Sequence, residues 1–302
     1  MRVLVTGSSG FAGRWLLRHL GDAGDQALTW PDDLDIRDRD AVVRGVAASG
    51  CEGIVHLAAQ ASVAASWRDP SATLAVNVVG TAHVLEGALA CQPRPRVVVV
   101  SSAEVYGHLE EADLPVGEHH AFAPASPYAA SKAAAELVGV QAFLGGGLEV
   151  VRARPFNHTG PGQRPDFVVP SFARQIAQAL REGSGRLLTG NLEVRRDLTD
   201  VRDVVRAYRS LLTAGRPGAV YNVCRGTSVS ISWVLRRMLE LAGADLEVVT
   251  DPGRVRPVDQ PDLRGDPGAL VAATGWRPQI DLDRTLGDVL DYWLSPAAPP
   301  GP

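Results

Sequence analysis

The chain has 302 residues, of which 45% are apolar and 21% are charged, a balance typical of a globular enzyme with one large or two modest domains. Its net charge of −4 and pI near 6.0 provide no basic surface for nucleic acid, and no apolar run suggests a membrane span. The three cysteines lie far apart without metal-ligand spacing, and a strand rather than a signal peptide opens the chain. We therefore expect a cytoplasmic protein with no metal site, no nucleic-acid partner and no membrane partner.

A strand, a glycine turn and a helix are predicted within the first twenty residues. The apolar run at residues 3–5 is typical of a buried parallel strand, and large apolar residues recur at helical spacing from residue 15. Between them, Gly7 would make a tight turn, Gly10 would admit a pyrophosphate to the backbone, and Gly13 would let the helix pack on the strand. The pattern G-x-x-G-x-x-G in this position indicates a dinucleotide-phosphate site at a helix N-terminus.

An acidic segment follows the second predicted strand, residues 26–30. Asp32 is a candidate for binding the adenosine ribose, and Asp35 and Ile36 could lie near the adenine. The alternative is a solvated acidic turn that caps the next helix. Because Arg14 could instead face a 2′-phosphate, the choice between NAD and NADP stays open.

A strand that ends in small residues is predicted over 53–60. Ala58 and Ala59 would let the backbone approach the cofactor, as the glycines do in the first turn. His56 lies inside the apolar run, and we expect a satisfied core histidine rather than a catalyst. The apolar pattern over 77–89 then predicts a helix.

The next strand leads to a candidate acid–base site. The apolar segment 96–100 is followed by Ser102, at the edge where open α/β sheets bind ligands. Pro127 suits the first turn of a helix, on which Tyr128 and Lys132 are four residues apart and share a face. A tyrosine can move a proton near neutral pH only if its pKa falls, and positive charge from a lysine favours the phenolate. Behind a glycine turn and a serine-bearing strand end, this pair indicates proton transfer.

The second half of the chain alternates less regularly between strands and helices. A strand is predicted over 148–153, and the polar segment 154–163 is rich in turn formers. The remaining predicted elements are helices over 167–180, from the charged segment 195–204 through 212, over 231–242 and over 282–293, with a strand over 219–223 and a loop over 251–266. The Pro/Ala/Gly-rich tail, 295–302, is expected to be disordered.

Nine motifs stand in the order of one known family. They are TGSSGFAG, HLAA, NVVGT, SSAEVYG, YAASK, RPFNHTGPGQ, RDLTDVRD, YNV and GWRP. With them the chain resembles the extended short-chain dehydrogenases/reductases that act on nucleotide sugars, over nearly its whole length. The second-half motifs, with the stretch 254–266, most resemble the reductases of GDP-4-keto-6-deoxy-hexoses, and the GDP-mannose 4,6-dehydratases are near relatives.

The resemblance implies an α/β fold, a Rossmann-type doubly wound parallel sheet with a smaller C-terminal substrate-binding domain. The NAD(P)-binding domain would span 1–154 with a return segment at about 191–223, and the nucleotide-sugar domain would combine 155–190 and 224–294. The resemblance also implies a homodimer and a nucleotide-sugar substrate, with a GDP-sugar favoured.

Site residues follow from the same resemblance. Tyr128 would be the acid/base, Lys132 would tune it and hold the nicotinamide ribose, and Ser102 would bind the sugar oxygen. The residues implied to bind the cofactor, NADP or NAD, are Gly7, Ser9, Gly10, Phe11, Ala12, Gly13, Asp32, Asp35, Ile36, Leu57, Ala58, Ala59, Asn77, Tyr128 and Lys132.

Arginine binds a diphosphate with a bidentate fork, so the substrate's two charges call for arginines in the second half. Asp259 could accept from a ribose hydroxyl pair, although a charged loop can also be merely solvated. The predicted substrate-binding residues are Ser102, Asn157, Arg174, Arg196, Arg254, Arg256 and Asp259.

The reaction is predicted to be reduction of the C4 keto group of a GDP-4-keto-6-deoxy-hexose. The alternatives are a 4,6-dehydratase, in which Glu104 would remove the C5 proton, and a 4-epimerase. Glu104 stands two residues after Ser102, where family dehydratases have their base, but related reductases also have an acidic group there. Ala103 replaces the aspartate that dTDP-sugar dehydratases use as acid. A non-catalytic nucleotide-sugar-binding protein is disfavoured by the complete Ser/Tyr/Lys set.

Overall fold

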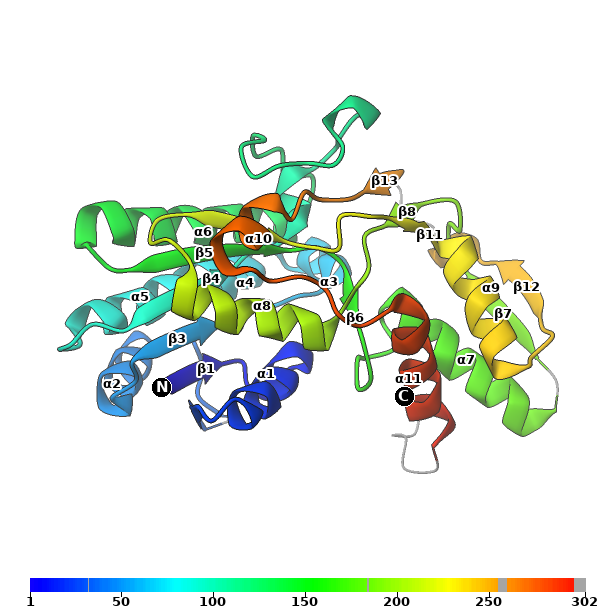
Figure 1. Ribbon diagram of the computed structural model, residues 1–302, viewed down its shortest axis with the longest axis horizontal. Coiled ribbons are helices and arrows are strands. Elements are labelled where there is room, and N and C mark those ends of the chain that lie inside the picture. Colours follow the sequence, from blue (N-terminus) through cyan, green and yellow to red (C-terminus); the bar gives the residue numbers. More distant parts are fainter. Residues whose placement is uncertain (32, 184, 255–259, 296–302) are drawn as a thin grey trace.

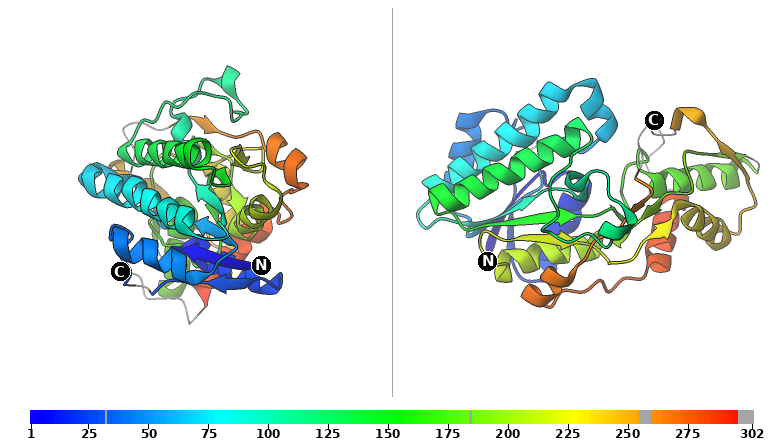
Figure 2. Two further views of the ribbon diagram at one scale, coloured as in Figure 1. Left: turned by 90° about the vertical axis from the view of Figure 1, so that its left-hand side faces the viewer. Right: turned by 90° about the horizontal axis from the view of Figure 1, so that it is seen from above.

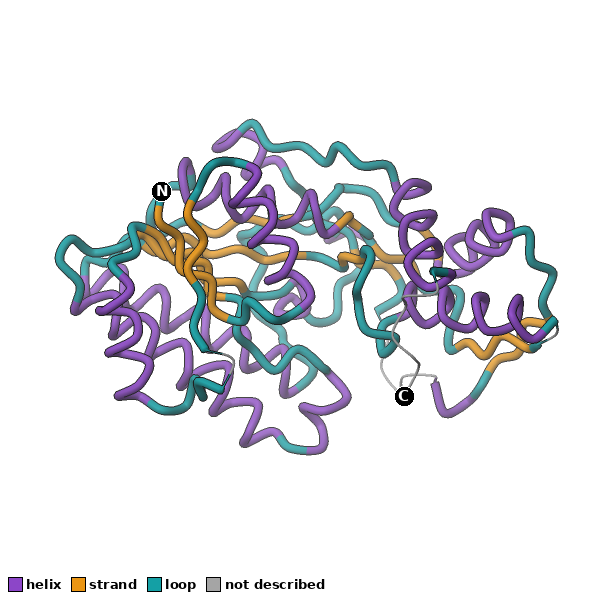
Figure 3. Tube along the Cα trace, turned by 90° about the horizontal axis from the view of Figure 1, so that it is seen from below, coloured by secondary structure: helices purple, strands orange, loops and turns teal. Residues whose placement is uncertain are grey.

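A computed structural model describes residues 1–31, 33–183, 185–254 and 260–295 and has two lobes (Figure 1). The larger lobe is built on a six-stranded parallel sheet with the order β10-β5-β4-β3-β1-β2. Its strands are β1 (Arg2–Thr6), β2 (Gln26–Leu28), β3 (Gly53–His56), β4 (Arg96–Val100), β5 (Val150–Pro155) and β10 (Val220–Val223). The chain enters this sheet on the side away from the smaller lobe (Figure 3).

Helices cover both faces of the sheet (Figure 2). Successive strand residues point to opposite faces, so Val3 and Val5 pack under one helix layer while Leu4 packs under the other. One layer holds α1 (Phe11–Asp22) and α8 (Val201–Ala214), and the other holds α2 (Arg39–Ser49), α5 (Gly80–Ala90) and α6 (Pro127–Gly146). Burial on both faces explains why the strands are nearly continuous runs of valine, leucine and isoleucine.

The smaller lobe has its own apolar core. This core joins the helices α7 (Val168–Glu182), α9 (Ile231–Ala242) and α11 (Leu282–Leu294), beside the parallel pair β7 (Arg186–Thr189) and β12 (Glu247–Thr250). Short strands lie outside both main layers. They are β6 (His158–Thr159) with β9 (Thr199–Asp200), and β8 (Arg195–Arg196) between β11 (Val229–Ser230) and β13 (Asp262–Leu263).

The predicted elements agree best where apolar patterns are strongest. Strand 96–100 and helix 231–242 have the predicted bounds, and the parallel sheet with helices on both faces confirms the Rossmann-type class. The second strand is shorter than predicted and ends at Leu28. Helix α10 (Gly268–Thr274) was not predicted; Leu270 packs into the core of the larger lobe, so this part of 224–294 lies away from α7, α9 and α11.

One helical run in the larger lobe meets the length and hydropathy of a membrane span. It covers Pro70–Ala90, from α4 (Pro70–Leu74) through a π-helical turn, η1 (Ala75–Val79), into α5, and its mean hydropathy is 1.3. Asn77, His83 and Glu86 interrupt it, so it is not the unbroken apolar run that the sequence analysis excluded. Half of this window is buried, and α5 contacts α2 and α6, as expected of a core helix.

Candidate active site

The turn after β1 forms a close-packed cradle of glycines. Gly7 has a φ of +67°, and a Cβ there would lie 2.7 Å from the backbone nitrogen of Ala58. A Cβ on Gly13 would lie 2.3 Å from the carbonyl oxygen of Gly7. Gly10 is the N-cap of α1, without a side-chain cap or an acidic residue in the first turn, so the helix N-terminus can take an anion. This donor set fits the diphosphate of a dinucleotide.

The end of β3 is fixed against β1 by a histidine that sequence analysis placed in the core. The Thr6 hydroxyl accepts from the backbone N–H groups of Leu57 (3.2 Å) and Ala58 (3.1 Å) and lies 2.7 Å from His56 Nδ1. His56 Nε2 lies 2.9 Å from the hydroxyl of Thr81. Burial lowers the pKa of His56 to about 3, so it is the neutral, satisfied core histidine expected. These bonds hold residues 57–59 at the carboxyl edge of the sheet.

Asn77 lies in the π-helical turn and is fully buried. Its Oδ1 accepts from the backbone N–H of Gln60 (2.8 Å), and its Nδ2 donates to the carbonyl of Gln60 (3.1 Å) and to Ser131 Oγ (2.8 Å). The side chain therefore ties the loop after β3 to α6. Sequence analysis placed Asn77 among the cofactor ligands; its three side-chain hydrogen bonds to Gln60 and Ser131 make a positioning role the alternative.

The acidic segment after β2 divides into an exposed and a buried part. Asp35 is exposed and hydrogen-bonds Arg37, which lowers the pKa of its carboxyl group to about 2. Ile36 is buried, and a Cβ added to Gly80 of α5 would lie 2.9 Å from it. Asp32 lies outside the described residues.

Arg14 is bound beside the glycine turn rather than at the acidic segment. Its guanidinium donates to the carbonyls of Ser9 (2.7 Å) and Gly162 (3.1 Å). Phe11 at the start of α1 stacks on His158, with ring centroids 6.1 Å apart. The glycine turn is thus joined directly to the segment that follows β5.

Ser102 and Tyr128 meet at the carboxyl end of β4. Ser102 caps a short 3-10 helix, η2 (Ala103–Tyr106), where its Oγ accepts from the backbone N–H of Glu104 at 3.2 Å. Ser126 caps α6 with Pro127 in the first turn, as the sequence indicated, and this places Tyr128 one residue into the helix. The Ser102 side chain lies near the Tyr128 phenol and acts on it as a hydrogen-bond partner that lowers its pKa.

The charge state of Tyr128 differs from the expectation. Burial raises its pKa to about 12, the Ser102 hydrogen bond opposes this, and the Glu104 carboxylate adds to it. Lys132 donates from Nζ to the carbonyl of Val100 at 2.6 Å, and burial lowers its pKa to about 8. In this structure Lys132 therefore does not depress the pKa of Tyr128, and the phenol is protonated at neutral pH.

The predicted substrate residues of the second half are spread over several loops. Asn157 is exposed just after β5, and its carbonyl accepts from the Thr199 N–H at 3.0 Å. Arg174 lies on α7, with a buried Nε for which no hydrogen-bond partner is found among the described residues.

Two of the predicted diphosphate-binding arginines have bonds to other parts of the chain. Arg196 on β8 donates to the carbonyls of Arg195 (2.8 Å) and Gln260 (2.7 Å), and Arg254 pairs with Asp251 at 3.2 Å. The other two candidates, Arg256 and Asp259, lie outside the described residues.

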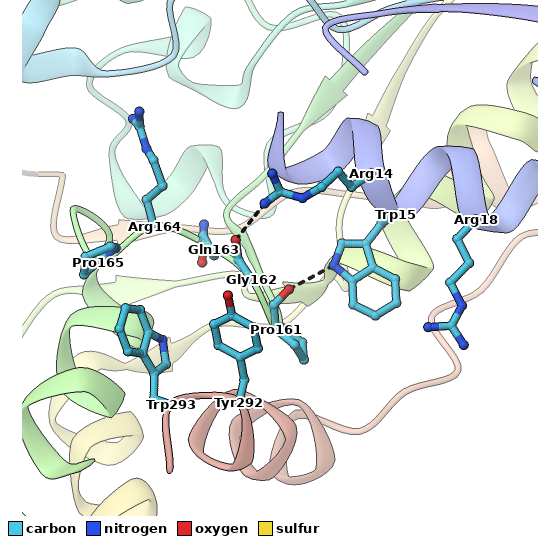
Figure 4. A pocket seen from close by; sticks show the side chains of 10 residues that line it. All are labelled: Arg14, Trp15, Arg18, Pro161, Gly162, Gln163, Arg164, Pro165, Tyr292 and Trp293. Carbon is cyan, nitrogen blue, oxygen red and sulfur yellow. Dashed lines mark hydrogen bonds between the residues drawn. The ribbon is translucent and has the colours of Figure 1, made fainter. Parts of the chain in front are cut away.

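A cavity of about 640 Å³ lies apart from these catalytic groups (Figure 4). It is bounded by α1, the segment 161–165 and α11, and in it Trp15 donates to the carbonyl of Pro161 at 3.0 Å. Neither Ser102 nor Tyr128 lines it, so cavity size does not locate the acid–base site. No set of three His, Cys, Asp or Glu side chains within the described ranges is arranged to hold a metal ion.

Sequence analysis missed a buried ionic cluster behind α6. Glu136 is fully buried and hydrogen-bonds Arg154, which itself contacts Tyr106. The signal was available, because Arg154 lies within the predominantly buried strand β5 and Glu136 stands one turn after Lys132 on the buried side of α6. Charged residues inside such patterns are rarely buried unless paired.

Comparisons with known proteins agree over most of the chain. The family model described as GDP-mannose 4,6 dehydratase matches residues 32–289. GDP-6-deoxy-D-mannose reductase of Pseudomonas aeruginosa is 39% identical over 97% of this chain and 97% of its own. A dTDP-glucose 4,6-dehydratase of Streptomyces antibioticus is 31% identical over 99% of this chain and 98% of its own. Among solved structures, RMD from Pseudomonas aeruginosa complexed with NADPH superposes with a TM-score of 0.88, at 37% identity, covering 97% of this chain and 98% of that one.

Proposed function

Because this chain belongs to the GDP-mannose 4,6-dehydratase family of NAD(P)-dependent short-chain dehydrogenases/reductases, we propose that it reduces the C4 keto group of a GDP-4-keto-6-deoxy-hexose. The observation that carries this proposal is the pairing of buried Ser102 with half-buried Tyr128 at the carboxyl edge of the sheet, in a chain 39% identical to a reductase of that kind. The same edge carries the glycine cradle after β1.

The nicotinamide cofactor, when bound, supplies the hydride. Tyr128 supplies the proton: its phenol is protonated at neutral pH, and reduction of a ketone needs an acid that gives a proton to the C4 oxygen. Ser102 lies beside the phenol, lowers its pKa, and can hold the same sugar oxygen. Lys132, with a pKa near 8, keeps most of its charge at neutral pH at the end of β4.

The cofactor would be held by the glycine cradle and by the small residues after β3. A Cβ at Gly7 or Gly13 would fill this cradle, which is why the turn needs glycine there. Family members use NAD or NADP, and a solved relative holds NADPH.

A 4,6-dehydratase is the second candidate function, and the position of Glu104 supports it. The Glu104 carboxylate acts on the pKa of Tyr128, so it stands close to the catalytic phenol, where a base for the C5 proton is needed. The family model and the Streptomyces relative carry the names of dehydratases. Identity favours the reductase, since the reductase relative is 39% identical and the dehydratase 31%.

The two reactions can be distinguished by whether they consume NADPH. The protein is incubated with GDP-4-keto-6-deoxy-D-mannose and, separately, with GDP-mannose, and NADPH absorbance is followed in each. A reductase consumes one NADPH per keto-sugar and leaves GDP-mannose unchanged. Loss of water from GDP-mannose without net NADPH consumption would overturn the proposal in favour of the dehydratase.

We also propose a homodimer formed through the helices beside the active site. Exposed apolar side chains gather on α3 (Val63–Arg68), on the α4–η1 run and on α6, which contacts both. They are Trp67, Leu74, Val79, Leu137 and Leu144. A patch of this kind marks an interaction surface. Leu137→Lys should convert a dimer into a monomer in sedimentation analysis, and a wild-type monomer would contradict the proposal.

The expected cytoplasmic location remains a proposal. Cys51, Cys91 and Cys224 are free thiols, which supports a reducing compartment.

A further inference from the structure

A buried ionic cluster lies between β5 and α6, the helix that carries Tyr128 and Lys132. Glu136 is on α6, one turn after Lys132, and is 0% exposed. Its Oε1 accepts from Arg154 Nη2 at 2.7 Å and its Oε2 from Arg154 Nε at 3.0 Å, while Arg152 Nη1 donates to Oε1 at 3.2 Å. A carboxylate this deep is stable only when charge and hydrogen bonds are both supplied, as they are here.

Arg154 connects the Glu136 carboxylate to Tyr106 of η2. Its guanidinium lies between the rings of Tyr106 and Phe122, 4.9 and 4.8 Å from their centroids. Its Nη1 donates to the Tyr106 hydroxyl at 3.0 Å, and that hydroxyl donates to Asn222 Oδ1 on β10 at 2.6 Å. The Tyr106 side chain is therefore fixed from two directions.

Tyr106 is the last residue of η2, the short helix that Ser102 caps and that contains Glu104. The cluster thus joins the two elements that bring the acid–base groups together, α6 with Tyr128 and η2 with Ser102. We propose that Glu136, Arg154 and Tyr106 are positioning residues that hold Ser102 against Tyr128, and that Glu136 also supports the positive charge of Lys132. The catalytic part of this inference rests on the proposed function.

The pKa of Lys132 depends on the charge of Glu136. Burial lowers the pKa of Lys132, and the negative charge of Glu136 opposes that shift. The other charged or titratable groups on α6 and the elements packed against it are Tyr128 on α6, Arg68 on α3, His83 and Glu86 on α5, Arg96 on β4, Glu104 and Tyr106 on η2, and Arg152 and Arg154 on β5. His56 on β3 also interacts electrostatically with Lys132. Removing the Glu136 charge lowers the pKa of Lys132 further, so Lys132 loses its proton at a lower pH.

The first experiment measures NADPH binding by fluorescence titration from pH 6 to about pH 9.5, a range that brackets the pKa of Lys132 near 8, in wild type and in Glu136→Gln. Lys132 is expected to hold the cofactor ribose, so affinity falls as pH rises through the pKa of this lysine. The midpoint of that fall should move down by about one pH unit in Glu136→Gln. An unchanged midpoint overturns the role of Glu136. No sugar substrate is present, so this result does not depend on the proposed reaction.

Glu136→Gln leaves two arginines without their counter-charge and can fail to fold, so Tyr106→Phe provides an independent test. It keeps the ring that stacks on Arg154 and removes only the hydroxyl. Turnover of the keto-sugar should fall about tenfold in kcat, as for a misplaced acid–base group, while KM and NADPH affinity stay within about twofold.

Tyr221→Phe is the matched control. Tyr221 is also buried, and its hydroxyl accepts one hydrogen bond, from the Arg216 N–H at 3.0 Å, outside the cluster. Its kcat should remain within about twofold of wild type. Equal kcat values for Tyr106→Phe and Tyr221→Phe would overturn the positioning role. If wild type fails to reduce the keto-sugar, the proposed reaction is wrong, and the NADPH-binding titration still decides the role of Glu136.

Discussion

Replacing Asn77 by alanine tests whether this residue positions the site or binds the cofactor itself. Three hydrogen bonds of its side chain are lost, two to the backbone of Gln60 and one to Ser131. Each contributes about 0.5–1.5 kcal/mol net, and the groups left behind are buried or partly buried, so the free energy of unfolding should fall by about 3 kcal/mol. A direct cofactor ligand on the surface of a cleft would show no such loss.

The assay is urea unfolding followed by circular dichroism, with NADPH affinity measured under conditions where the variant stays folded. Ser71→Ala is the control, because Ser71 is exposed on the same helical run and should change stability by less than about 0.5 kcal/mol. If Asn77→Ala keeps wild-type stability while NADPH binding weakens tenfold or more, the positioning role is refuted and Asn77 is a cofactor ligand.

Three further variants test the cradle and the acid–base groups. Gly13→Ala should abolish measurable NADPH binding in a fluorescence titration, since its Cβ would lie 2.3 Å from the carbonyl of Gly7; wild-type affinity would contradict the cradle. Tyr128→Phe should keep the fold and NADPH binding but lose about 10²- to 10⁴-fold in kcat, and near-normal turnover would remove Tyr128 from the acid role. Glu104→Gln should keep most of the NADPH consumption with the keto-sugar, because a reductase needs no base at C5; abolished NADPH consumption would show that Glu104 takes part in the reduction itself and would contradict this.

The first βαβ unit and the buried strands could be predicted from the sequence because each depends on local pattern. The strand Arg96–Val100 was predicted from a continuous apolar run and the helix Ile231–Ala242 from helical periodicity, and the structure has both with the predicted bounds. Helix α10 is short and its few apolar residues give no clear period, so sequence alone does not predict that Leu270 packs in the larger lobe.

The rest of the site depends on contacts between segments that are distant in the sequence, and residue spacing along the chain does not predict such contacts. Tyr128 and Lys132 share a helix face, as predicted, but Lys132 bonds the end of a neighbouring strand and burial dominates the pKa of Tyr128. The pairing of Glu136 with Arg154 requires β5 to lie behind α6, which follows from the order of strands in the folded sheet.

The central claim is that hydride passes from the cofactor to C4 of a keto-sugar while Tyr128 supplies the proton. NADPH that carries deuterium at its transferable position, given to the enzyme with GDP-4-keto-6-deoxy-D-mannose, tests it most directly. The account predicts one deuterium per product molecule, located at C4 of the sugar by NMR, and a transfer rate lowered about 10²- to 10⁴-fold in Tyr128→Phe. A product without deuterium at C4, or deuterium found at C6, would contradict it.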